Sequence, residues 1–459
     1  MTKAKTRFNH ENVTKTLFRV SFPIMFMSLL FASFFFVDSL MIAHFVKYDD
    51  GRTGAAVLGM VTPITTFFFS FITIWIVGNA LNYTKLLAQD NPEAARQSAS
   101  QAIMMSIVGG LSLSMIVALI AKPYMNWVGG KGTAPLTQEQ IQDGINYIIV
   151  FAFCYPLFSI EDTFIRTQRA EGKGLSSIIF PVISVFINIL FNWIFMGVIG
   201  TGIYGAALAL MVALATTVAG AFLYSIYLRK KGEIELQIVP KYMKPNWPLI
   251  TVIVGFGIVS VVRRIAFSYN SLLISIFISQ MGEGWKEWVT SATVTANMLN
   301  QISLGMLQGT AMLLSYWYNS GQKKAAKEVM WKGFVFVIGI QFVVAGVMML
   351  TGSQILSLFD VPGEMKFLRS YYLVALMLIA SAAVTFGPFM YASLKDGKSS
   401  MAHIVIWIIV VTIFQFSFFY GFDAAKPGNE ILYIMSLPIS LFAAWIFTLP
   451  IIITKYKSI

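Results

Sequence analysis

The sequence is poor in charged residues, and this scarcity excludes most classes of soluble protein. Only 12% of the 459 residues are charged, whereas 57% are hydrophobic. A soluble chain of this length cannot bury so much apolar surface, so the composition indicates an integral membrane protein. The apolar runs are continuous rather than alternating, which favours spanning helices over the strands of a closed barrel.

Residues that carry chemistry are scarce as well. The single cysteine, Cys154, lies within an apolar segment, so no disulfide forms within one chain. The histidines His10, His44 and His403 are too scattered for a metal site, and no nucleophile–base pair stands out. A glycine-rich phosphate loop is absent too. We therefore expect no enzyme, no ATPase motor and no cofactor. An ion gradient, or the gradient of the substrate itself, must drive any transport.

Twelve apolar segments are long enough to cross a bilayer, which takes about 20 residues. They lie near 15–45, 56–86, 98–121, 144–169, 175–199, 203–228, 248–280, 289–317, 330–351, 369–394, 400–421 and 430–454. The first run is too long for a signal-peptide core and has no cleavage site, so we interpret it as a spanning helix. The expected fold is an all-α integral membrane protein with 12 transmembrane helices.

The distribution of positive charge predicts the orientation. The net charge is +12, and lysine and arginine gather at both chain ends and in the even-numbered loops, as at 229–231, while the odd loops are mixed or acidic. Such an excess marks cytoplasmic loops rather than a nucleic-acid site. We predict a multi-pass protein of the cell membrane with both termini in the cytoplasm. It should contact membrane lipids and no nucleic acid.

The two halves of the chain repeat one another. Three pairs of segments match in chain order at offsets between 225 and 232 residues. They are 78–96 with 309–327, 36–42 with 268–274, and 171–173 with 396–398. A membrane chain built from two similar halves is the usual layout of a secondary transporter, whose substrate site lies between the halves.

A basic linker that contains prolines, 229–247, separates six segments from six. We predict an N-terminal six-helix lobe at 1–228, a cytoplasmic linker, and a C-terminal six-helix lobe at 248–459. Because six is even, both lobes have the same orientation and are related by an axis along the membrane normal. We expect a monomer of two pseudo-symmetric lobes.

Asp38 is the strongest candidate for a functional residue, because burying a carboxylate deep in a spanning segment costs free energy and such a residue usually has a function. It can take up and release a proton, bind a sodium ion, or serve as a structural hydrogen-bonding group. Asn188 and Asn192 are four residues apart and share a helix face. They either assist Asp38 or join helices. Pro23 should bend the first helix, as a hinge or as a static kink.

Two further charged groups interrupt spanning segments. Glu161 is placed to line the cytoplasmic cavity and to meet substrate, while its neighbour Asp162 is expected to pair with Arg166 at i, i+4. Arg263 and Arg264 need a compensating partner at their depth. Asp38 or Glu161, an anionic substrate, or a lipid headgroup would supply one. Otherwise both arginines snorkel to the cytoplasmic surface.

The repeated stretch, Asp38 with its flanking residues, and the run that contains Asn188 and Asn192 together resemble the multidrug and toxin extrusion (MATE) family. The resemblance covers essentially the whole chain. It implies a V-shaped pair of six-helix lobes and export of organic cations or amphiphiles in exchange for protons or sodium. By position, Asp38 matches the acid of the first helix, the two asparagines match polar residues of the fifth, and Pro23 matches a bending proline.

The chain also departs from that family pattern. Some members carry acids in the C-terminal lobe, whereas the corresponding segments 262–265 and 383–386 contain none here. Ion coupling is therefore expected in the N-terminal lobe. Arg263 and Arg264 argue against a purely cationic substrate.

Three functions remain in competition. The leading hypothesis is an ion-coupled antiporter that exports organic cations, drugs or other amphiphiles. The alternative is a flippase for a lipid-linked or anionic amphiphile, which the two arginines favour. A scaffold or receptor that has lost transport is the third, and the buried acid at Asp38 argues against it.

Overall fold

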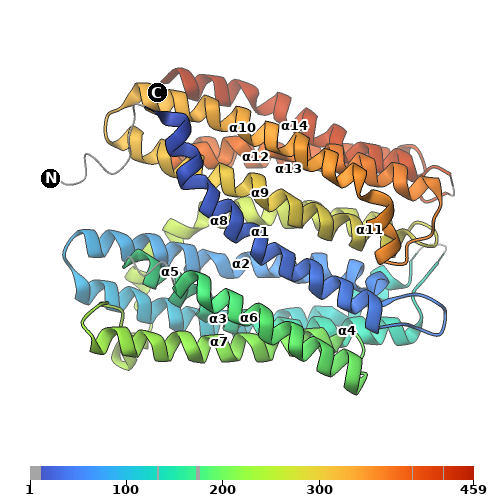
Figure 1. The fold of residues 1–459 in the computed structure, drawn as a ribbon, viewed down its shortest axis with the longest axis horizontal. Helices are drawn as coiled ribbons and strands as arrows, with labels where there is room; N and C mark the ends of the chain where they lie inside the picture. Colours follow the sequence, from blue (N-terminus) through green and yellow to red (C-terminus); the bar gives the residue numbers. More distant parts are fainter. Residues whose placement is uncertain (1–11, 132–133, 172–175, 395, 427, 459) are drawn as a thin grey trace. The chain divides into compact units, whose positions relative to one another are not determined.

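In the computed structural model, residues 12–131, 134–171, 176–394, 396–426 and 428–458 are described, and almost all of them are helical (Figure 1). The elements are α1 (Val13–Phe45), α2 (Gly54–Ala88), α3 (Pro92–Gly129), α4 (Gln138–Ala152), α5 (Cys154–Ala170), α6 (Ser176–Asn192), η1 (Trp193–Ile199), α7 (Tyr204–Lys230), η2 (Pro240–Met243), α8 (Trp247–Ile278), α9 (Trp285–Asn319), α10 (Lys323–Leu350), α11 (Gly352–Leu358), α12 (Met365–Ser393), α13 (Gly397–Gly421) and α14 (Glu430–Ser458).

The prediction of an all-helical membrane protein is confirmed. Each of the twelve predicted segments coincides with one helix or with two consecutive helices, and the bounds differ by at most eight residues. Ten stretches of the described residues have the length and hydropathy of a spanning helix. Helix α9 is not among them. Its many Ser, Thr, Asn and Gln residues lower its hydropathy, and several are buried within the protein.

The segment predicted at 144–169 is broken in the middle. Helix α4 ends at Ala152 and α5 begins at Cys154, with Pro156 in its first turn. A proline has no N–H to offer the carbonyl four residues earlier. That carbonyl, on Ala152, accepts a hydrogen bond of 2.6 Å from the Ser114 hydroxyl of α3 instead.

The helices pack into two compact units. The N-unit is Val37–Ser279, and the C-unit combines α1 as far as Phe36 with the chain from Gln280 onward. The packing thus groups α8 with the helices of the first half and the start of α1 with those of the second half. The lobes predicted at 1–228 and 248–459 remain a prediction about the arrangement in the membrane.

Glycines allow the closest helix contacts in both units. In the N-unit, a Cβ at Gly78 of α2 would lie 1.9 Å from the Ile253 carbonyl oxygen of α8, and one at Gly257 would lie 1.8 Å from the Ile74 oxygen. In the C-unit, Gly309 of α9 is equally tight against Ser21 of α1. Since Gly78 and Gly309 are equivalent positions of the repeat, the repeat preserves a packing device.

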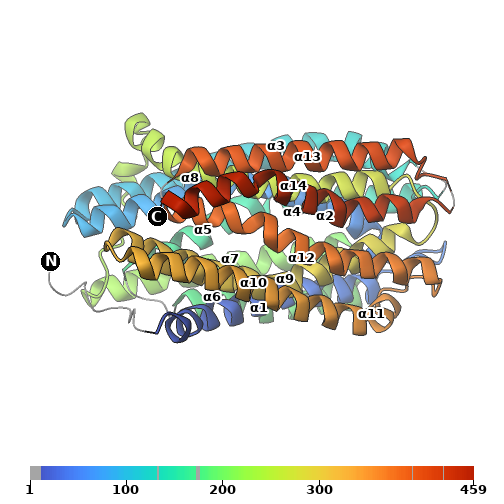
Figure 2. The same ribbon diagram turned by 90° about the horizontal axis from the view of Figure 1, so that it is seen from above.

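The remaining core follows these contacts. In the N-unit, α2 also packs on α3, and α7 packs on α6 and α5. In the C-unit, α12 lies against α14, α10 and α9. Figure 2 shows α12 together with α14 and α10. The linker after α7 is ordered: Gln101 of α3 donates to the Lys244 carbonyl at 2.6 Å, and Arg96 pairs with Glu235.

Candidate functional site

The structure brings Asp38, Asn188 and Asn192 together within the N-unit. Asn192 Nδ2 donates to Asp38 Oδ1 and also, at 2.8 Å, to Asn188 Oδ1. Both asparagines are fully buried, and Asp38 is half-buried about two turns before α1 ends. We refer to these three residues as the carboxyl–amide cluster.

Local backbone geometry positions the amides. Asn188 and Asn192 are one turn apart in the last part of α6, so their side chains lie on one face. Directly after Asn192 the helix widens into the π-helix η1, which ends at Ile199 and is followed by Gly200 with a φ of 74°. π-Helical turns are rare and frequently adjoin functional sites, because they re-aim the side chains around them.

The cluster has the donor set of a proton or sodium site. Asn188 Nδ2 and Asn192 Oδ1 are buried atoms without a hydrogen-bond partner. The carboxylate of Asp38 and the two amide oxygens are hard oxygen ligands, as a small hard cation prefers. The carboxyl alone would hold a proton. Among the described residues, no group of three or more His, Cys, Asp or Glu side chains is arranged to hold a metal ion.

An aromatic residue that the sequence interpretation missed also belongs to this region. Tyr147 of α4 is nearly fully buried and lies close enough to Asp38 to interact with it electrostatically. Its ring stacks on Phe151, with centroids 5.7 Å apart. No local pattern identifies this tyrosine, because its proximity to Asp38 depends on how α4 packs. Pro23 lies within the backbone of α1, but its side chain is outside the described set, and its hinge role stays a prediction.

Glu161 lies apart from the carboxyl–amide cluster. Its side chain in α5 is 7% exposed and lies against Thr217 of α7. One carboxyl oxygen, Oε1, is buried without a hydrogen-bond partner. The predicted pairing of Asp162 with Arg166 is confirmed at 2.9 Å, with both side chains about one-third exposed. The substrate contact predicted for Glu161 stays a prediction.

The structure gives Arg264 surroundings that the sequence interpretation did not anticipate. Its guanidinium carbon lies 4.8 Å from the centre of the Phe69 ring of α2, a cation–π distance. The acid that interacts with it within the N-unit is Asp162, rather than Asp38 or Glu161. Arg264 is exposed, whereas Arg263 is half-buried.

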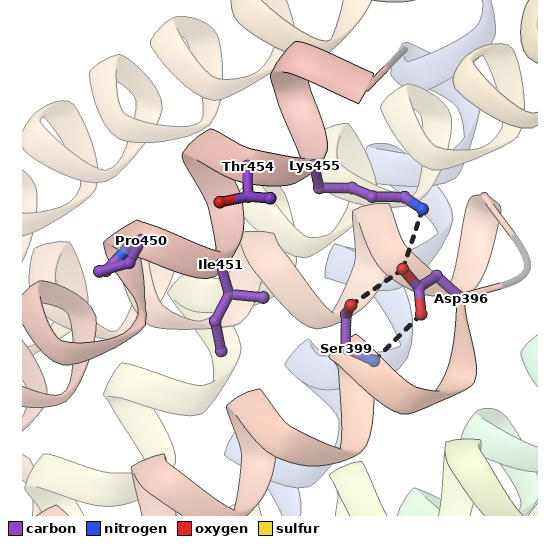
Figure 3. A pocket seen from close by; sticks show the side chains of 6 residues that line it. All are labelled: Asp396, Ser399, Pro450, Ile451, Thr454 and Lys455. Carbon is purple, nitrogen blue, oxygen red and sulfur yellow. Dashed lines mark hydrogen bonds and ion pairs between the residues drawn. The ribbon is translucent and has the colours of Figure 1, made fainter.

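A surface pocket of about 470 Å³ lies in the C-unit, where the loop before α13 meets the end of α14. Figure 3 shows Asp396 accepting hydrogen bonds from the N–H and hydroxyl of Ser399, at 3.1 and 2.9 Å, and pairing with Lys455 at 2.9 Å. Lys455, together with these hydrogen bonds, lowers the pKa of Asp396 to about 2. Its carboxylate therefore caps α13, and the acid of the repeated Asp-Gly-Lys segment has a structural role here.

The sequence is similar to known transporters. Residues 23–194 match the profile of the MatE family. The multidrug export protein MepA of Staphylococcus aureus (strain bovine RF122 / ET3-1) is 24% identical over 77% of this chain and 75% of its own length. The uncharacterized MG447 homolog MYCGA2290 of Mycoplasmoides gallisepticum is 21% identical over 97% of this chain and 90% of its own.

Solved structures agree in fold. An inward-facing multidrug resistance MATE family transporter of the MOP superfamily superposes with a TM-score of 0.77 at 15% identity, covering 96% of this chain and 98% of its own. A MOP superfamily transporter from Pyrococcus furiosus, described as having a binding pocket of reverse polarity, reaches 0.75 at 16% identity, covering 96% and 95%. At these identities the similarity establishes the fold.

Proposed function

Because the chain belongs to the MATE family of membrane transporters, we propose that it is an antiporter that exports organic cations, drugs or other amphiphiles in exchange for protons or sodium ions. The observation that carries the coupling part of this proposal is the carboxyl–amide cluster. Export of drugs is supported by the MepA relatives and by the MATE structures of the same fold. We further propose that the protein is a monomer in the cell membrane with both termini in the cytoplasm.

The cluster suits an exchange between two states. When Asp38 is ionised, the Asn192 amide stabilises its charge by a hydrogen bond, and amide and carboxylate oxygens can bind a sodium ion. When a proton neutralises Asp38, the electrostatic part of that hydrogen bond weakens. Binding of the coupling ion therefore changes how α1 is joined to α6. Such a difference between states is what allows an ion gradient to shift a conformational equilibrium.

The test replaces Asp38 with Asn, which keeps the size of the side chain and a hydrogen-bonding oxygen. Purified protein in liposomes loaded with ethidium would receive a proton gradient or a sodium gradient, each imposed alone. Gradient-driven ethidium transport should fall at least about tenfold in Asp38→Asn. The gradient that drives wild-type transport identifies the coupling ion.

Asp49→Asn is the matched control, since Asp49 is exposed in the loop after α1. It should transport ethidium at the wild-type rate. Undiminished gradient-driven transport by Asp38→Asn, in protein of normal thermal stability, would refute coupling at the cluster.

A second candidate function is a flippase for an anionic or lipid-linked amphiphile. Arg264 favours it, because the residue is exposed and an anionic group is a natural ligand for an arginine. The similarity to the transporter described with a pocket of reverse polarity adds support. If this candidate is right, an anionic fluorescent lipid should compete with ethidium transport or replace it, and Arg264→Gln should abolish that competition.

A further inference from the structure

Glu161 is a more deeply buried acid of the N-unit than Asp38. With 7% of its side chain exposed, it lies in the middle of α5, and Oε1 has no hydrogen-bond partner. A carboxylate buried in this way loses its hydration without compensation, unless a cation or several donors replace the water.

Among the residues that the structure describes, no positive charge forms an ion pair with Glu161. The ion pairs formed by the described residues do not include it, and the only charged group that interacts with it is the like charge of Asp162. Of the helices that pack on α5, α7 faces Glu161 with the uncharged Thr217, and no charged group of the described parts of α2, α3, α4 and α6 interacts with it. Asp162 differs in kind, because it is partly exposed and bonded to Arg166.

The neighbouring hydroxyl fits a neutral acid. Thr217 Oγ1 lies 3.1 Å from the carbonyl oxygens of Ala213 and Leu214 in its own helix, and either oxygen can accept its hydrogen. Its lone pairs remain free to accept a hydrogen bond. A protonated Glu161 has an O–H to donate to them, whereas an ionised Glu161 has no proton to donate.

Polar side chains between α5 and α7 lead from Glu161 to the end of α5; we call Thr217, Gln168 and Ser225 the α5–α7 seam. Gln168 lies seven residues further on the same helix face, about 10 Å along the axis, and two residues before α5 ends. Its Nε2 donates to the Ser225 hydroxyl of α7 at 2.7 Å, while its Oε1 is buried without a partner. Buried polar atoms without partners are the groups that an entering water would satisfy.

We propose that Glu161 is a second proton-binding site of the N-unit, protonated in this conformation and deprotonated through the α5–α7 seam in another conformation of the transport cycle. In the release step the O–H bond of the carboxylic acid breaks, and the proton passes to water that has entered past Gln168 and reached the carboxyl group. The carboxylate stays behind and is hydrated by the same water. The proposal rests on the antiport function proposed above, and adds to Asp38 a second carboxyl nearer the opposite end of the N-unit helices.

The experiment compares Glu161→Gln with Asp162→Asn in the same liposome assay with ethidium. Glutamine imitates the protonated side chain but cannot release a proton. We expect gradient-driven ethidium transport by Glu161→Gln to fall at least about tenfold, while ethidium binding to the purified protein stays at the wild-type level. Asp162→Asn, the adjacent acid on the surface, should keep wild-type transport.

Infrared spectroscopy provides a readout that does not depend on transport. Wild-type protein titrated with acid and base should show the carbonyl-stretch band of a buried carboxylic acid. That band should weaken in Glu161→Gln and persist in Asp162→Asn.

Wild-type transport by Glu161→Gln would overturn the proposal, because the acid would then be a structural group that never releases its proton. An infrared band unchanged by the substitution would overturn it too. The result for Asp38→Asn tests the antiport function, whereas the result for Glu161→Gln tests the second proton site. If that variant loses coupling while Glu161→Gln does not, the antiport function stands and only the second site fails.

Discussion

Gly257→Ala should destabilise the protein, although alanine is normally the better helix residue. Its added Cβ would lie 1.8 Å from the Ile74 carbonyl oxygen of α2, which is 1.2 Å less than the 3.0 Å below which real Cβ contacts are essentially absent. The obstacle is backbone, so α2 and α8 must separate along their contact. Overpacking of this kind costs about 1–3 kcal/mol, more than the roughly 0.5–1 kcal/mol that alanine contributes to a helix.

Gly255→Ala is the matched control. Gly255 lies two residues away on α8, is exposed, and has no neighbouring atom within 4 Å of an added Cβ. This variant should be neutral or slightly stabilised. Thermal unfolding in detergent, followed by the fluorescence of the ten tryptophans, should show Gly257→Ala unfolding several degrees below it.

A double substitution sharpens the test. Gly78 is tight against the same helix pair, so a separation caused by Gly257→Ala should relieve part of the strain at Gly78. The double variant Gly78→Ala/Gly257→Ala should therefore be destabilised by less than the sum of the two single destabilisations. Equal unfolding temperatures for Gly255→Ala and Gly257→Ala would refute the close backbone contact of α2 and α8.

Two further predictions concern charged groups. The pKa of Asp396 lies near 2 in the folded protein against 3.8 ordinarily, so its carboxylate stabilises the fold above pH 4 and loses this effect as the pH falls through about 2. Asp396→Asn should therefore make the unfolding temperature less sensitive to acid. A pH profile of the unfolding temperature that the substitution leaves unchanged would contradict the capping role. Cysteine in place of the exposed Arg264 should react with a water-soluble thiol reagent faster than cysteine in place of the half-buried Arg263, and the buried Cys154 should give a low background. Protection of the introduced cysteine by ethidium would indicate a substrate-facing position. A labelling rate that ethidium does not change would leave the account in which the arginines snorkel to the membrane surface.

Local sequence features predicted the secondary structure well. Hydropathy located all twelve segments, because a spanning helix satisfies its own backbone and needs only about 20 apolar residues. The i, i+4 spacing correctly placed Asn188 beside Asn192 and Asp162 beside Arg166, since both pairs lie on single helices. The repeat pointed to Gly78 and Gly309, although their shared role as close-packing sites became visible only in the structure.

Everything that depends on which helices are neighbours was decided by tertiary structure. The sequence left the partner of Arg264 open among Asp38, Glu161, an anionic substrate and a lipid headgroup, and only the packing of α8 shows that Asp162 is close enough to interact with it electrostatically. The sequence could not show that α7 packs Thr217 against Glu161, because that contact joins two helices far apart in the chain. Hydropathy and spacing along one chain describe a helix by itself. The neighbours of a helix depend on where small residues such as Gly257 allow backbones to approach, and that is settled only when all the helices pack at once.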